Sequence, residues 1–222
     1  MLSLKGLTQQ PPVKVAGAMK NIMQKADLSA YCLLDTLDRT HLFGLGPVAG
    51  LKGELLILDG KIYSSTRSDN GLLNKQDQVN KASMLVYCYA KEWEKITVNV
   101  SIGNYAELEK IVAGKATEYG YDISVPFVFR IEIIPGQADY HVIDWKDSVS
   151  HTAGNHKLFA YNGTIRQKKI NVLGFYSERD HGIFTHHSSN IHVHLVEDET
   201  GLVGHLDDIR SKGEWVLYLP SR

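Results

Sequence analysis

"IHVHLVEDETGLVGHLDD", residues 191–208, carries the pattern of a β-hairpin. Polar and apolar residues alternate in "IHVHL", which is typical of a strand with one buried face. A second apolar run, "LVGHLDDI", follows the turn-like "DETG". We therefore expect two antiparallel strands whose turn is centred between Glu199 and Thr200.

The hairpin brings three histidines together. Side chains two residues apart in a strand lie on the same face, so His192 and His194 are expected side by side. A turn centred between residues 199 and 200 places His194 opposite His205, with Cβ atoms about 5 Å apart. Three neutral imidazoles on two adjacent strands suit zinc or another divalent transition metal and leave positions open for a substrate.

Further histidines precede the hairpin. Six of the ten histidines of the chain fall within residues 181–205. His181, His186 and His187 lie in "RDHGIFTHHSS", which is too irregular to predict a strand. His181 reads as a solvated loop residue, whereas His186 and His187 are either solvated or close enough to the metal to bind substrate.

The rest of the chain predicts an α+β fold, rich in strands and poor in helices. Short apolar runs separated by turns recur from Cys32 onward, and Asp59-Gly60 lies between two of them as a tight hairpin turn. Helices are expected over residues 15–26 and 105–117, the second opening with Asn104 and Glu107 as a capping pair. Residues 146–164 are polar and read as a long loop. We expect two strand-rich subdomains with mixed or antiparallel sheets, an α/β one over residues 1–120 and an antiparallel one over residues 121–222.

Composition and charge argue against nucleic acid and membranes as binding partners. With 222 residues and a formal net charge of −1, the chain has no clustered basic surface for nucleic acid or an anionic membrane. Cys32 and Cys88 lie among apolar neighbours and read as buried free thiols. No stretch has the length of a signal peptide or a membrane span, so a cytoplasmic protein is expected unless a leader has been removed.

Three motifs, in order along the chain, resemble the acetolactate decarboxylases. The hairpin is similar to that family's metal-binding segment, in which an H-x-H pair is followed after a turn by G-H. "GLGPVAGLKGELLILDGKIY" (residues 44–63) resembles its glycine-rich lead into a GEL motif. "PFVFRIE" (residues 126–132) is similar to a family strand that bears an arginine.

The resemblance implies roles for individual residues. His192, His194 and His205 would bind zinc, Glu54 would be the active-site carboxylate, and Arg130 would hold the substrate carboxylate. From the residues alone, Glu54 also reads as a solvated strand end, and Arg130 as a surface partner of Glu132.

One departure from the family concerns the C-terminus. In the well-characterised branch a tail beyond the last strand returns a glutamate to the metal, whereas "WVLYLPSR" stops at Arg222. We therefore expect a shortened, divergent member in which His186 or His187 replaces that glutamate as a catalytic group.

The resemblance implies that 2-acetolactate, a 2-hydroxy-3-keto acid, is decarboxylated to acetoin and CO₂, with zinc as Lewis acid and electron sink. A homodimer is compatible with the sequence. Two alternatives stay open. One is a cupin-like metalloenzyme in which Glu199 completes an H-x-H-x₄-E ligand set; the other is a non-catalytic zinc-containing homologue that binds a small hydroxy or keto acid.

Overall fold

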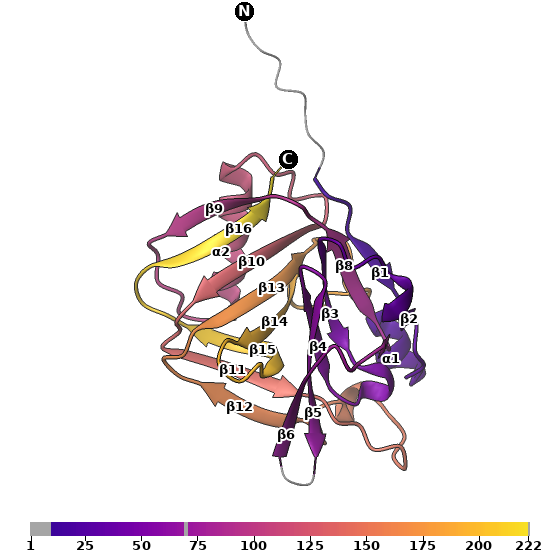
Figure 1. Ribbon diagram of the computed structural model, residues 1–222. Helices are drawn as coiled ribbons and strands as arrows, with labels where there is room; N and C mark the ends of the chain where they lie inside the picture. Colours follow the sequence, from indigo (N-terminus) through magenta and orange to yellow (C-terminus); the bar gives the residue numbers. More distant parts are fainter. Residues whose placement is uncertain (1–9, 69–70, 222) are drawn as a thin grey trace, which may run out of the picture.

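A computed structural model describes residues 10–68 and 71–221, and two large antiparallel sheets dominate it (Figure 1). The first sheet has six strands in the order β1-β8-β3-β4-β5-β6. Their bounds are Lys14–Ala16, Leu85–Tyr89, Leu42–Pro47, Glu54–Leu58, Lys61–Ser68 and Gly71–Gln76. A short pair, β2 (Cys32–Leu33) and β7 (Lys81–Ala82), lies beside it.

The second sheet has eight strands in the order β12-β11-β15-β14-β13-β10-β16-β9. Their bounds are Tyr161–Ile165, Gln137–Val142, Val203–Arg210, Ile191–Glu197, Ile170–Tyr176, Phe127–Ile133, Trp215–Pro220 and Trp93–Val98. The expected α+β class, with many strands and few helices, is confirmed. The division at residue 120 stays a prediction; the chain passes from the first sheet to the second between β8 and β9.

Over the described ranges two α-helices complete the fold, α1 (Met19–Lys25) and α2 (Tyr105–Glu118). The Asn104 side chain accepts a hydrogen bond from the Glu107 N–H, as the capping pair predicts. The expected helix over residues 15–26 is wrong at its start, because residues 14–16 pair with β8 as β1 and Gly17, at φ 74°, turns the chain before α1. Neither helix in the described ranges is long and apolar enough to cross a membrane.

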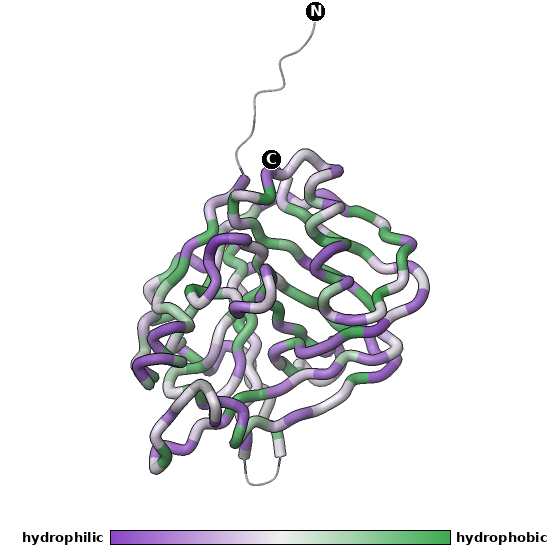
Figure 2. The backbone as a smooth tube through the Cα atoms, turned by 180° about the vertical axis from the view of Figure 1, so that it is seen from behind, coloured by the Kyte–Doolittle hydropathy of each residue, from purple (hydrophilic) through white to green (hydrophobic). Residues whose placement is uncertain are grey.

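The two sheets face each other across a shared core. Phe43, Leu45 and Leu56 of the first sheet pack with Leu173 and Phe175 of the second. On its other face the large sheet packs against α2 through Leu108, Val112 and Ala116. Hydrophobic stretches therefore run along the strands, while the connecting turns are mostly hydrophilic (Figure 2).

Local chemistry explains the hairpin that carries Glu54. Leu58 pairs with Lys61, and the turn residues Asp59 and Gly60 have φ of 48° and 79°. Two left-handed residues form the tight turn that matches strand twist, and Asp-Gly is favoured there. A Cβ at position 60 would lie 2.2 Å from the Arg39 carbonyl oxygen, so glycine is required. This hairpin presents Glu54 and Leu55 to the large sheet.

The expected loop over residues 146–164 is only partly irregular. It contains one turn of 3-10 helix, Ala153–Asn155, and ends in β12, which pairs with β11 at the edge of the large sheet. The segment between β11 and β12 carries His151, His156 and Lys157.

Candidate metal and substrate site

Three histidines converge on the inner face of the large sheet. The β14–β15 register pairs His194 with His205, which confirms the register expected from the hairpin. The ring centroids of His192 and His194 lie 5.0 Å apart, and that of His205 lies 5.2 and 5.5 Å from them. His192 and His194 are buried and the His205 side chain is 12% exposed, so their ring nitrogens need partners inside the protein.

These nitrogens find few partners among the described residues. His194 Nδ1 lies 2.9 Å from the Leu55 carbonyl oxygen, to which it donates, and this leaves Nε2 as the free acceptor. Nε2 of His194, Nδ1 of His192 and both ring nitrogens of His205 are buried without a hydrogen-bond partner. Such groups are costly unless a ligand satisfies them.

The three imidazoles are held in the neutral form. Burial lowers the pKa of His194 to about 3, even though its hydrogen bond to the Leu55 carbonyl acts in the opposite direction. Burial and neighbouring imidazoles hold the pKa values of His192 and His205 well below the ordinary range. Neutral imidazoles with free lone pairs are the form that binds zinc, so the donor set fits a divalent transition metal.

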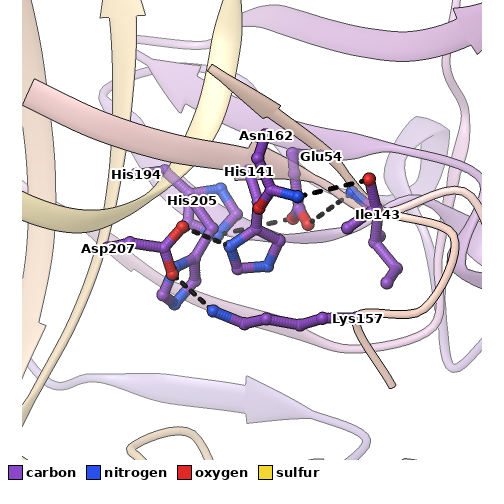
Figure 3. A network of polar contacts seen from close by, with 9 residues as sticks. Glu54, His141, Ile143, Lys157, Asn162, His194, His205 and Asp207 are labelled. Carbon is purple, nitrogen blue, oxygen red and sulfur yellow. Dashed lines mark hydrogen bonds and ion pairs between the residues drawn. The ribbon is translucent and has the colours of Figure 1, made fainter. Parts of the chain in front are cut away.

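A second polar group adjoins this cluster (Figure 3). Asp207 lies between two cationic or ionisable groups, 2.8 Å from His141 Nδ1 and 2.5 Å from Lys157 Nζ. Burial opposes ionisation of Asp207, but these two hydrogen bonds outweigh it and its pKa is lowered. A β-bulge explains its position: Leu206 and Asp208 pair with consecutive residues of β11, so Asp207 is the extra residue.

Two ligand sets share His205. Ligand atoms of His141, His205 and Asp207 all lie within 4.8 Å of one another and form an alternative to the three-histidine set. However, Asp207 already accepts hydrogen bonds from His141 and Lys157. The three-histidine set instead has the unsatisfied ring nitrogens, with Asp207 and His141 beside it.

Glu54 reaches the same place from the first sheet. It is 4% exposed, and its Oε2 lies 3.6 Å from His194 Nε2. Its Oε1 accepts a weak hydrogen bond from the Ile143 N–H at 3.4 Å. Burial raises its pKa well above the ordinary value, so the carboxyl favours its protonated form in this setting.

A cavity opens beside these groups, and we call it the histidine cavity. Its polar side is formed by Glu54, His141, His156, Lys157, His186, His192 and His205. Its apolar side is formed by Met19, Ile22, Met23, Pro47, Leu51, Met84 and Ile143. Methionine side chains are flexible and adapt to the shape of a ligand, so this wall suits a small, partly apolar molecule.

The structure treats the two loop histidines differently. His186 lines the cavity, with its ring 5.8 Å from that of His205, and burial lowers its pKa. His187 does not line the cavity; its ring lies close to Gly182, and its carbonyl oxygen is 3.3 Å from His181 Nδ1.

Arg130 does not reach the histidine cavity. Its guanidinium lies over the rings of Phe43, Trp93 and Tyr218 at 5.2–5.6 Å. In the sheet register Arg130 pairs with Leu173, and Leu173 pairs with His194, so one buried leucine separates the arginine from the three histidines. The structure instead brings Lys157 to the cavity.

Sequence reasoning missed His141, His156, Lys157 and Asp207. Asp207 follows His205 by two residues, and the alternation used for His192 and His194 was a signal for it. His141 had no local signal, because it meets His205 only through the pairing of β11 with β15.

Glu199 is remote from the cluster. It lies at the hairpin turn with a side chain 74% exposed, and it is paired with Lys168 at 2.9 Å. The structure therefore gives no support to a cupin-like ligand set completed by this residue.

Comparisons with known proteins agree with this architecture. The crystal structure of alpha-acetolactate decarboxylase from Bacillus subtilis strain 168 superposes with a TM-score of 0.77 at 13% identity, covering 95% of this chain and 86% of that one. A Staphylococcus aureus protein of unknown function, described as similar to alpha-acetolactate decarboxylase, superposes with a TM-score of 0.74 at 15% identity, covering 93% and 84%. No curated protein matches the chain. The family model for alpha-acetolactate decarboxylase matches residues 17–218, and the chain therefore belongs to that family.

Proposed function

We propose that the protein is a zinc-dependent decarboxylase that converts 2-acetolactate to acetoin and CO₂. The observation that carries the proposal is the convergence of three histidines, with buried and unsatisfied ring nitrogens, beside the buried Glu54 carboxyl. His192, His194 and His205 would hold the metal. A divalent ion bound there would supply a Lewis acid that polarises the ketone of a 2-hydroxy-3-keto acid.

The chain's own residues account for the remaining requirements. The apolar wall around Met19, Met23 and Met84 excludes water from the reacting carbon. When CO₂ leaves, the carbon that carried it needs one proton. Glu54 holds a proton at its buried carboxyl, and His186 is the other cavity group able to move one. Neither role requires an organic cofactor.

The test is an assay of acetoin formation from 2-acetolactate by protein of measured zinc content. We expect turnover by zinc-loaded protein, and a loss of at least about a hundredfold in His194→Gln, since a missing ligand impairs the metal site. His41→Asn is the matched control, because His41 lies at an exposed turn against Asp59 and asparagine tolerates its φ of 57°.

The outcomes separate activity from metal binding. Stoichiometric zinc without acetoin formation would reject the decarboxylase proposal and leave a zinc-containing binding protein. Equal turnover by His194→Gln and the wild type would reject the ligand assignment.

A further inference from the structure

We propose that Lys157 binds the carboxylate of the substrate and restricts the histidine cavity to small monoanionic acids. The identity of that acid as 2-acetolactate rests on the proposed function; the selectivity for a carboxylate does not. Lys157 belongs to the segment between β11 and β12, and not to either of the two strands, β14 and β15, that carry the three histidines.

The charges of the cavity favour this assignment. Among the described residues that line it, Lys157 is the single lysine or arginine. A carboxylate entering the cavity would therefore meet one cationic side chain, the Lys157 ammonium, beside the proposed metal site.

Asp207 holds the Lys157 ammonium where the lysine borders both the histidine cavity and an outer groove. Lys157 lines both the histidine cavity and an outer groove, whereas Asp207 lines the groove and not the cavity. The ammonium has three N–H donors, and Asp207 Oδ1 accepts one of them at 2.5 Å. The remaining donors are available to an anion, and the side chain is 52% exposed, so it is accessible.

The distance from the Lys157 ammonium to the three histidines suits a short substrate. Asp207 Oδ1 lies 2.5 Å from Lys157 Nζ and 3.8 Å from His205 Nδ1. The Lys157 ammonium and the His205 imidazole are therefore close enough for a molecule of a few carbon atoms to contact both. Arg130 offers no comparable geometry, because its guanidinium is covered by three aromatic rings.

The experiment measures binding instead of turnover. Zinc-loaded protein is titrated calorimetrically with 2-hydroxyisobutyrate, a hydroxy acid without the ketone, and with its neutral amide. We expect the wild type to bind the acid roughly tenfold to hundredfold more tightly than the amide, the range of a charge-assisted hydrogen bond. Lys157→Met should lose this preference and Lys157→Arg should keep most of it.

Two further variants control for charge and for the competing cation. Lys168→Met removes a surface lysine that is paired with Glu199, and it should keep the wild-type preference. Arg130→Met should keep it also. The proposal is overturned if the wild type shows no preference for the acid, if Lys157→Met retains the preference at equal zinc content, or if only Arg130→Met loses it.

Failure of the proposed function would look different. Absence of acetoin formation together with a preference that depends on Lys157 would reject the reaction and retain the carboxylate site. Acetoin formation together with a preference for the acid that Lys157→Met leaves unchanged would retain the reaction and reject the carboxylate site.

Discussion

The Glu54 carboxyl lies in an environment that differs strongly from water. It is 4% exposed, its neighbours across the cavity are neutral imidazoles, and Ile143 donates the one backbone hydrogen bond that it receives. No arginine or lysine contacts it among the described residues. The chain therefore folds more favourably with the Glu54 carboxyl protonated than with it ionised. Burial thus explains both the proton that Glu54 can donate and the loss of stability when the group ionises.

Glu54→Gln tests this account. The unfolded carboxyl ionises at its ordinary pKa, so folding of metal-free wild type above that pH requires proton uptake, and stability falls as pH rises toward the raised folded pKa. Glutamine avoids this cost. We expect the variant to gain stability over wild type between pH 5.5 and 8, by up to about 1.4 kcal/mol per pH unit. Urea unfolding at both pH values measures the gain.

A glutamate-to-glutamine change at an exposed position controls for the loss of charge alone. Glu92→Gln serves, since Glu92 lies on the surface before β9. A stability difference between Glu54→Gln and wild type that stays constant from pH 5.5 to 8 would contradict a raised folded pKa.

At the scale of elements, local sequence patterns predicted the two hairpins that carry the three histidines and Glu54. Alternation and turn chemistry predicted the β14–β15 register and the Asp59-Gly60 hairpin, because both depend on residues within about ten positions. Long-range pairing had no such signal. His141 faces His205 because β11 pairs with β15, and Lys157 reaches the cavity from a segment that reads only as polar loop.

Helix α2 offers a test of a locally encoded element. Asn104 caps it by accepting from the Glu107 N–H at 2.9 Å, and the Glu107 carboxylate accepts in turn from the Gly103 N–H at 2.8 Å. Asn104→Ala removes the acceptor at the helix start. We expect a loss of about 1 kcal/mol in the free energy of unfolding, measured in urea, without a change in zinc content. Asn104→Ser should recover most of that loss, and an equally unstable serine variant would argue against capping.

At the scale of the whole molecule, the site lies where the two sheets meet. The large sheet supplies all three histidines proposed to bind metal, while the first sheet supplies Glu54 and the Leu55 carbonyl that orients His194. The shared core joins the same strands on either side of the cluster. Occupation of the proposed metal site would therefore stabilise the packing of one sheet on the other, and not only the hairpin.

Zinc should accordingly stabilise the folded chain as a unit. A ligand that binds only the folded state at a hundred times its dissociation constant adds about 2.7 kcal/mol. For a chain of this size that raises the unfolding temperature by roughly 5–10 °C. Differential scanning calorimetry with zinc and with a chelator measures the shift. His192→Ala with His194→Ala should abolish it, His41→Asn should preserve it, and a zinc-induced shift that persists in the double variant would place the metal elsewhere, with His141, His205 and Asp207 as the next ligand set to test.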